Sequence, residues 1–310
     1  MSTAARSLIC IVGPTASGKS AVSELVAERT GGEIVSIDAM QIYRGMDIGT
    51  AKTPASARRV PLHMVDIVDV DDDYSVERFQ DDARVVIDEL IAAGKPPVLC
   101  GGTGLYLDAV IDEMVFPHGS RECESRARYE ALAEELGAEG LHALLAERDP
   151  ASAEIIHPNN VRRVVRALEM LDEGVSYASH HEGLLARAEH YPAQIWALAW
   201  PRDVLAERIA RRVDAMFEQG LVDEVKGLIA RGLTRDATAG QAIGYKEVLD
   251  YLDGTASLEE TRELICARTR RYAKRQLSWL RRDGRVSWVD MTEHDAASAA
   301  DAIVRTWEAR

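Results

Sequence analysis

The feature that most constrains this chain is the octapeptide GPTASGKS at residues 13–20, which follows the apolar run LICIV and precedes AVSELVAER. It matches the pattern G-x-x-x-x-G-K-[ST] completely, the signature of a phosphate-binding loop (P-loop) between a buried strand and a helix. Successive backbone N–H groups of such a loop converge on phosphate oxygens at the positive end of the helix. We therefore predict a phosphate site formed by Gly13, Pro14, Thr15, Ala16, Ser17, Gly18, Lys19 and Ser20.

Two side chains of this loop add chemistry to the backbone. Lys19 supplies a positive point charge, and the hydroxyl of Ser20 is placed to ligate Mg²⁺. The loop predicts phosphate binding but does not decide which phosphate compound is bound.

The first hundred residues alternate between apolar runs and helical patterns. Strands are expected at 8–12, 32–38, 62–68 and 96–102, with helices at about 20–29 and 75–95. Strands that alternate with helices pair in parallel through right-handed crossovers, and helices then cover both faces of the sheet. The predicted fold class is α/β, with a P-loop parallel sheet as its core.

The strand pattern stops after about Pro117 and returns at QIWALAW, residues 194–200. Residues 118–190 show helical periodicity instead, so we expect a helical insertion between residues 1–117 and residues 191–310 of the core. The C-terminal region is expected to be mostly helical, with a long helix at about 258–282, a short strand at 286–290 and a last helix.

The composition excludes several classes of protein. No apolar stretch reaches the roughly 18 to 20 residues that a membrane span needs, and the N-terminal residues leave no room for a signal peptide. The four cysteines are far apart and form no C-x-x-C pair, which argues against a zinc site and a disulfide framework. A cytoplasmic protein with reduced thiols is expected.

The charge is unevenly distributed along the chain. The formal net charge is −14, yet residues 262–285 contain nine basic and two acidic residues, a local charge of +7. A second basic cluster consists of Arg162, Arg163 and Arg166. Two basic clusters on an acidic chain predict local contacts with an anionic partner.

Two further segments are expected at the same edge of the sheet as the P-loop. Asp38 follows the second strand, where its carboxylate could hold metal-bound water or accept a proton from a bound nucleophile. The fourth strand runs directly into GGTGLY, residues 101–106. Because parallel strands present their carboxyl ends at one edge, these segments are predicted to share a site.

Six segments in this order and spacing carry a family resemblance: GPTASGKS, DAMQIYRGMDIGTAK, GGTGLY, HPNNVRRVVRALE, AIGYKE and RRYAKRQLSWLR. Together they resemble the bacterial tRNA dimethylallyltransferases (tRNA isopentenyltransferases) over nearly the whole chain. The resemblance implies transfer of a dimethylallyl group from dimethylallyl diphosphate to N6 of the adenosine 3′-adjacent to the anticodon, with Mg²⁺ as cofactor. It also implies that the P-loop holds a diphosphate, and that the enzyme is a monomer.

The resemblance also implies roles for individual residues. Asp38 would be the general base, Thr103 would contact the target nucleotide, and Arg212 would lie near the diphosphate. Ala39 stands where most relatives have serine, and Met40 and Gln41 would recognise an adenine flipped out of its stack. The remaining implied tRNA contacts are Arg126, Arg162, Arg163, Arg166, Gln241, Gly244 and Lys246.

Three other functions are weighed against this interpretation. A nucleotide kinase could use the same loop, but the tract after Asp38 resembles a prenyltransferase. Prenylation of free AMP would need neither the helical insertion nor the basic helix. A non-catalytic, nucleotide-gated RNA-binding protein would need the basic clusters but no carboxylate at Asp38.

Overall fold

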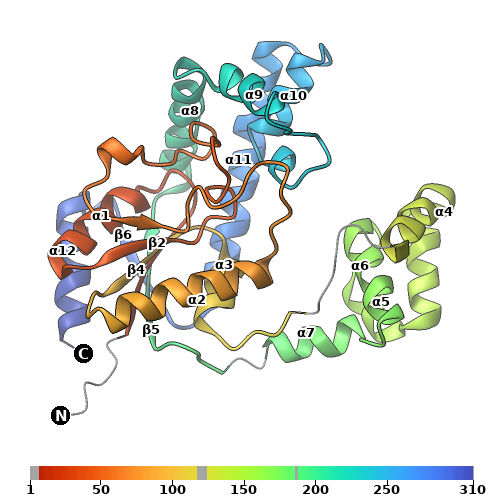
Figure 1. Cartoon of the computed structure of the whole chain (residues 1–310), viewed down its shortest axis with the longest axis horizontal. Coiled ribbons are helices and arrows are strands. Elements are labelled where there is room, and N and C mark those ends of the chain that lie inside the picture. Colours follow the sequence, from red (N-terminus) through yellow and green to blue (C-terminus); the bar gives the residue numbers. More distant parts are fainter. Residues whose placement is uncertain (1–6, 117–123, 186–187, 310) are drawn as a thin grey trace. The chain divides into compact units, whose positions relative to one another are not determined.

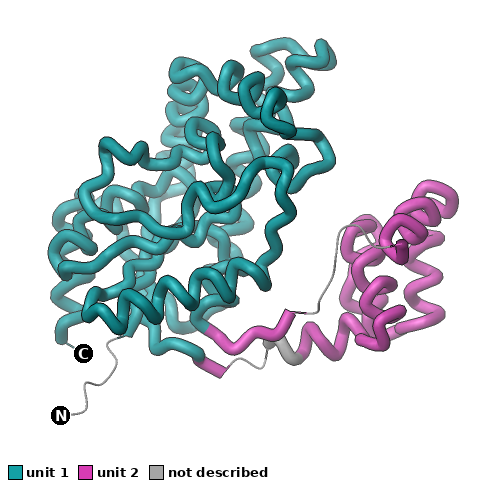
Figure 2. The backbone as a smooth tube through the Cα atoms, viewed as in Figure 1, with its two compact units in different colours: residues 1–111, 190–310 teal, residues 112–189 magenta. Residues whose placement is uncertain are grey.

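The computed structural model describes residues 7–116, 124–185 and 188–309 (Figure 1). The chain forms two compact units (Figure 2): unit 1 comprises residues 1–111 and 190–310, and unit 2 comprises residues 112–189. The sequence-based boundaries, 117/118 and 190/191, lie close to these divisions. Each unit has its own apolar core and is described separately below.

Unit 1 is built on a six-stranded sheet in which every pair of neighbouring strands is parallel. The strands are β1 (Leu8–Val12), β2 (Glu33–Ser36), β3 (Leu62–His63), β4 (Pro97–Gly101), β5 (Ala193–Ala199) and β6 (Val286–Asp290). They lie in the order β3-β2-β4-β1-β5-β6. The predicted α/β class with a parallel sheet is confirmed, and the segments after β1, β2 and β4 emerge from three adjacent strands.

The third strand is much shorter than predicted. Residues 62–68 were expected to be extended, but only Leu62 and His63 form a strand, with one isolated bridge between Tyr43 and Val68. Met64 and Asp66 have φ values of 58° and 57°, in the left-handed region. These residues turn the chain away from the sheet, which an apolar pattern cannot reveal.

Helices cover both faces of the sheet because alternate strand residues point to opposite sides. In β1, Leu8, Cys10 and Val12 belong to one core cluster, whereas Ile9 and Ile11 belong to another. The second cluster is closed by α1 (Lys19–Thr30) and α12 (Ala296–Glu308), which pack together. The first cluster is closed by α2 (Val76–Ala92), α3 (Gly104–Ile111) and the helices of the C-terminal region.

Those C-terminal helices are α8 (Arg202–Glu218), α9 (Leu221–Ile229), α10 (Tyr245–Leu252) and α11 (Leu258–Leu280). The helix α11 begins with a capping box, in which Ser257 and Glu260 each accept a hydrogen bond from the other's backbone N–H. It packs against both α8 and α10. Two 3₁₀ turns, η1 (Ala55–Ala57) and η2 (Ala239–Gln241), complete unit 1.

Unit 2 is helical, as predicted for the insertion. It consists of α4 (Glu124–Arg148), α5 (Pro150–Ile155), α6 (Val161–Asp172) and α7 (Tyr177–Leu185), with α4 broken at Gly137. Asp172 joins α6 to α4, because its carboxylate accepts hydrogen bonds from Ser125, Tyr129 and Arg148. In the described part of the chain, no helix is long and apolar enough to span a lipid bilayer.

Candidate active site

A cavity of about 930 Å³ lies at the carboxyl edge of the sheet in unit 1. The P-loop, the segment after β2 and the turn after β4 all line it, as the sequence predicted. Of the predicted site residues, the lining includes Thr15, Ala16, Gly18, Lys19, Ser20, Asp38, Ala39, Met40, Gln41, Thr103, Arg212 and Gln241.

The P-loop adopts the conformation that its glycines permit. Gly18, the residue before α1, has a φ of 96°, which a residue with a Cβ rarely adopts. The Lys19 ammonium folds back over the loop and donates to the carbonyl oxygen of Pro14 at 2.8 Å. The first N–H groups of α1 have no partner within the helix, so they are available to an anion.

The electrostatic surroundings of Lys19 favour an anionic ligand. Burial, together with the nearby Arg212 guanidinium, lowers the pKa of Lys19 to about 8, while Cys100 and Asp38 oppose the shift. A bound phosphate would offset this unfavourable burial and hold the ammonium in its charged form.

Two residues distant in sequence brace the P-loop from outside. The indole of Trp200 donates to the carbonyl oxygen of Ser17 at 2.9 Å, and Arg208 Nε donates to that of Ala16 at 2.8 Å. The Arg208 guanidinium also lies 4.5 Å from the centre of the Trp200 ring. These contacts tie the loop to α8.

Asp38 and Thr103 are held by backbone groups of the segment after β2. Asp38 Oδ1 accepts a hydrogen bond from Met40 N at 2.9 Å, and Thr103 Oγ1 accepts one from Ala39 N at 3.3 Å. The Asp38 carboxylate also influences Arg212: burial lowers the pKa of this guanidinium, and the attraction of Asp38 opposes that shift. An acid, a hydroxyl and two cations therefore face one cavity.

The structure adds cavity residues that the sequence analysis did not single out. Arg208 and Arg211 come from α8, one turn and one residue before Arg212, and Arg275 comes from α11. The helix α11 contributes further lining residues at helical spacing: Ile265, Thr269, Tyr272 and Gln276. The basic run at 262–285 was noted as a charge cluster, but its periodicity could also have indicated this lining face.

The tract after Asp38 is fixed by a carboxylate of α9. Glu224 accepts hydrogen bonds from the backbone N–H groups of Asp47, Ile48 and Gly49, and from the phenol of Tyr245. Gln41 Nε2 reaches the carbonyl oxygen of Thr50 in the same tract. This arrangement places residues 49–51 in the cavity wall.

Several predicted residues lie away from the cavity wall. Gly13, Pro14 and Ser17 belong to the P-loop, but they are buried and do not line the cavity. Gly244 is the N-cap residue that precedes α10, and Lys246 donates to Gln241 Oε1.

The predicted arginines of unit 2 fall into two groups. Arg162 and Arg163 are exposed on α6. Arg126 and Arg166 instead form ion pairs with Glu169, whose side chain is almost fully buried. These two guanidinium groups therefore contribute to the packing of unit 2.

Comparison with known proteins identifies the family. A family model described as IPP transferase matches residues 41–283, more than half of the chain, and a model described as isopentenyl transferase matches residues 6–60. The chain belongs to the IPP transferase family. The resemblance inferred from the six sequence segments is thereby confirmed.

Relatives in the IPP transferase family match this chain over most of its length. A tRNA dimethylallyltransferase of Halalkalibacterium halodurans is 46% identical and covers 93% of this chain and 92% of its own. A tRNA dimethylallyltransferase of Kineococcus radiotolerans is 48% identical, and the match covers 91% of this chain and 90% of the relative.

Two solved structures show the same family likeness. The tRNA isopentenylpyrophosphate transferase of Bacillus halodurans has a TM-score of 0.72 at 44% identity and covers 98% of this chain and 97% of its own. A eukaryotic dimethylallyltransferase described as acting on tRNA has a TM-score of 0.77 at 28% identity, with 96% and 77% covered.

Proposed function

We propose that this protein transfers a dimethylallyl group from dimethylallyl diphosphate to N6 of the adenosine 3′-adjacent to the anticodon in tRNA. The observation that carries the proposal is the common cavity of the P-loop, Asp38, Thr103 and Arg212. Membership of the IPP transferase family and the names of the relatives support the same reaction.

The residues of the cavity account for each part of the reaction. The bond between the allylic carbon and the diphosphate oxygen breaks, and the new bond forms from that carbon to N6. The departing negative charge is stabilised by the P-loop amides, Lys19 and Arg212. Asp38 accepts the proton that N6 must lose, and Thr103, held by Ala39 N, orients the base.

The site residues fit a magnesium ion that is bound mainly through the substrate. The Ser20 hydroxyl is exposed and lines the cavity at the start of α1. Within the described residues there is no group of three or more His, Cys, Asp or Glu side chains that could hold a metal by itself. Mg²⁺ often takes one or two protein ligands plus phosphate oxygens and water, and when bound it neutralises charge on a diphosphate. Ser20 would be its protein ligand.

Binding of the tRNA is assigned to Met40, Gln41 and Gln241 in unit 1, and to the exposed Arg162 and Arg163 in unit 2. A monomeric enzyme in the cytoplasm is our proposal for its state and location. A nucleotide kinase would use the same P-loop, but family membership disfavours it.

One experiment tests the proposal against its alternatives. The protein is incubated with Mg²⁺, labelled dimethylallyl diphosphate and either an unmodified tRNA, AMP or ATP. Label transferred to N6 of the tRNA adenosine, with none to AMP, is the expected result. Transfer to AMP, steady ATP turnover, or tRNA binding without transfer would each support one of the other functions.

A further inference from the structure

The turn that carries Thr103 is packed tightly against α11. A Cβ atom added at Gly102 would overlap with Gln276 Nε2, and one added at Gly104 would overlap with the indole of Trp279. Only glycine at these two positions allows α11 to approach the turn so closely. Trp279 thus packs directly on this turn.

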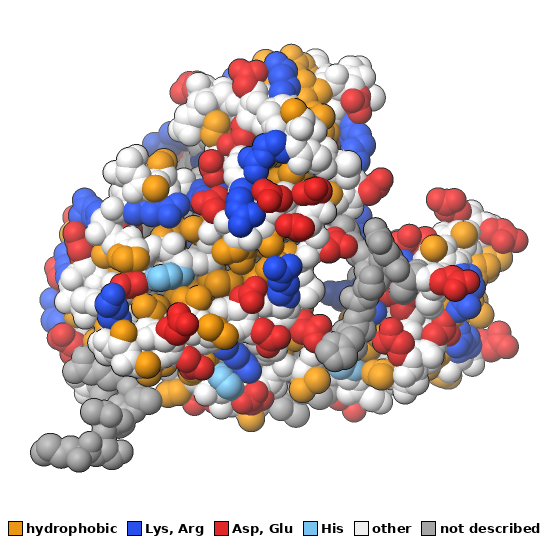
Figure 3. Space-filling view, viewed as in Figure 1, with side chains coloured by type: hydrophobic (Ala, Val, Ile, Leu, Met, Phe, Trp, Pro, Cys, Tyr) orange, Lys and Arg blue, Asp and Glu red, His pale blue; other side chains and the backbone are white. Residues whose placement is uncertain are grey.

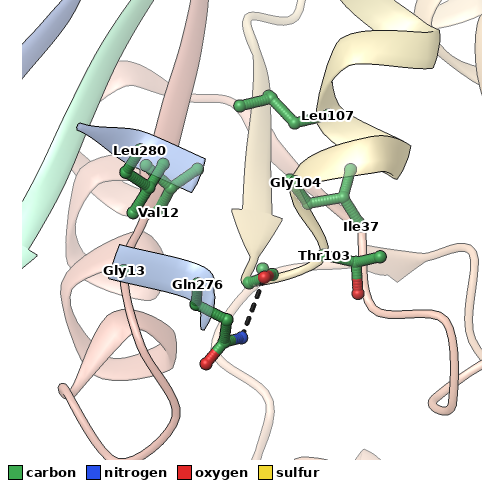
Figure 4. Close-up of a pocket in the computed structure, with 10 residues that line it drawn as sticks. Val12, Gly13, Ile37, Thr103, Gly104, Leu107, Gln276 and Leu280 are labelled. Atoms are coloured by element: carbon green, nitrogen blue, oxygen red, sulfur yellow. Dashed lines mark hydrogen bonds between the residues drawn. The ribbon is translucent and has the colours of Figure 1, made fainter. Parts of the chain in front are cut away.

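A single amide side chain of α11 joins this turn to the P-loop. Gln276 Oε1 accepts a hydrogen bond from Thr15 N at 2.9 Å. Its Nε2 donates to the carbonyl oxygen of Gly102 at 2.8 Å (Figure 4). The side chain is buried, with an exposed fraction of 7%. Both ends of the amide are therefore used, and its orientation is determined by its two partners.

Tyr272, one helical turn before Gln276, contacts the same group of residues. Burial raises the pKa of its phenol to about 12, although hydrogen bonds to Thr103 and Gln276 oppose the shift. The face of α11 that holds Gln276 thus also contacts the Thr103 side chain.

We infer that Gln276 is a positioning residue for prenyl transfer, because it holds the P-loop and the Thr103 turn in a fixed relative position. This inference rests on the proposed function. The P-loop would bind the leaving diphosphate, whereas Thr103 would orient the attacking base. Gln276 therefore sets the geometry between the two reacting partners through Thr15 and the Gly102 turn, and its loss reduces kcat more than it weakens pyrophosphate binding.

The substitution Gln276→Glu tests the donor half of the amide. The carboxylate still accepts from Thr15 N, but its second oxygen faces the Gly102 carbonyl oxygen with no proton to donate. At about pH 8 we expect kcat to fall roughly 10-fold or more, since small displacements of reacting groups cost this much. Protonation restores the donor, and burial raises the pKa of a carboxyl group. The ratio of variant to wild-type kcat should therefore rise as the pH is lowered towards about 6.

The substitution Gln276→Met removes both hydrogen bonds at similar side-chain volume and serves as the second variant. We expect a low kcat whose ratio to wild type does not change with pH. Glu259→Gln, at an exposed position of the same helix outside the basic run, is the matched control and should behave as wild type. Near wild-type kcat in the Met variant, or in the Glu variant at about pH 8, would overturn the inference.

Hydrogen exchange separates this inference from the proposed function. We expect faster exchange at residues 13–18 and 101–106 in Gln276→Met, and no change in Glu259→Gln. If wild-type protein transferred no prenyl group, the proposed function would fail, while faster exchange would still show that Gln276 joins the two segments. Unchanged exchange in the Met variant would refute the joining role whatever the activity.

Discussion

Asp38 combines a structural contact with a chemical role, and the two can be separated by one substitution. Its Oδ1 accepts a hydrogen bond from Met40 N, which orients the segment after β2. Asparagine keeps an oxygen for this contact but cannot accept a proton from N6. The substitution Asp38→Asn therefore preserves the turn but removes the basic carboxylate.

We predict that Asp38→Asn folds normally, binds tRNA nearly as well as wild type and loses about 10² or more in kcat. Single-turnover prenylation with saturating dimethylallyl diphosphate measures the chemical step. A near wild-type rate would show that Asp38 only caps the turn.

Lys19 is the second residue with a separable role. It is half-buried, and its ammonium contacts the carbonyl oxygen of Pro14. We predict that Lys19→Ala abolishes measurable binding of pyrophosphate, because the loop loses the only point charge that it carries itself. Calorimetry with pyrophosphate checks this, with Lys226→Ala on the exposed surface of α9 as the control. An unchanged affinity of Lys19→Ala for pyrophosphate would mean that the loop amides and the cavity arginines bind the anion without Lys19.

At the scale of elements, helices position loops that have no regular structure of their own. The carboxylate of Glu224 in α9 accepts three backbone N–H groups from residues 47–49 and the Tyr245 hydroxyl from α10. One side chain thus connects two helices to the tract that lines the cavity.

We predict that Glu224→Gln loosens this tract, because its amide –NH₂ would face donors that need an acceptor. An unsatisfied buried donor costs about 1–3 kcal/mol. Hydrogen exchange at residues 46–52 should accelerate and the KM for tRNA should rise. Equal exchange in the variant and wild type would show that Tyr245 and Gln41 hold the tract alone.

In unit 2, Asp172 makes the packing of α4 against α6 sensitive to acid. Burial raises the pKa of Asp172, but hydrogen bonds from Arg148, Ser125 and Tyr129 outweigh burial and lower it to about 2 from 3.8. A carboxyl group whose pKa is lower in the folded state than in the unfolded state stabilises the folded protein fully at pH values above its unfolded-state pKa. That contribution is lost as the pH falls from about 4 to 2.

We predict a loss of roughly 2 kcal/mol of unfolding free energy from this residue over that range. Denaturant titrations of wild type and Asp172→Asn between about pH 5 and 2 measure it. The stability difference between the two proteins should shrink as the pH falls. A stability difference that does not change with pH would mean that the folded-state pKa of Asp172 is not lowered.

At the scale of the whole molecule, the net charge of −14 repels an anionic partner such as tRNA. Acidic and basic side chains are interspersed on the face shown in Figure 3. Attraction to tRNA therefore depends on local clusters, and among the predicted arginines of α6, Arg163 is exposed whereas Arg166 pairs with Glu169.

We predict that tRNA affinity falls steeply with salt, and that Arg163→Glu weakens binding and lowers the slope of log K against log salt by about 1. Pyrophosphate binding should not change. Arg166→Glu should instead destabilise unit 2, because it leaves Glu169 buried without this partner. An affinity independent of salt would contradict local electrostatic binding.

The sequence alone determined the features whose cause is local. The P-loop needs glycines and a lysine at fixed spacing, and alternation of apolar runs with helical patterns specified the parallel sheet. Because the carboxyl ends of parallel strands share one edge, the sequence alone assigns Asp38 and Thr103 to the same site as the P-loop. The prediction of a strand over residues 62–68 was wrong, because an apolar pattern does not reveal the left-handed backbone conformation of Met64 and Asp66.

Only the tertiary structure decided which distant side chains complete the site. Gln276 meets Thr15 across 261 positions of sequence, and Glu224 meets Gly49 across 175. It also decided that Arg126 and Arg166 neutralise Glu169. The pairings of Gln276 and Glu224 depend on how α11 and α9 pack over the sheet edge, and those of Glu169 on how α6 packs against α4. A local pattern can say that a residue is polar and helical, but only the fold determines its partner.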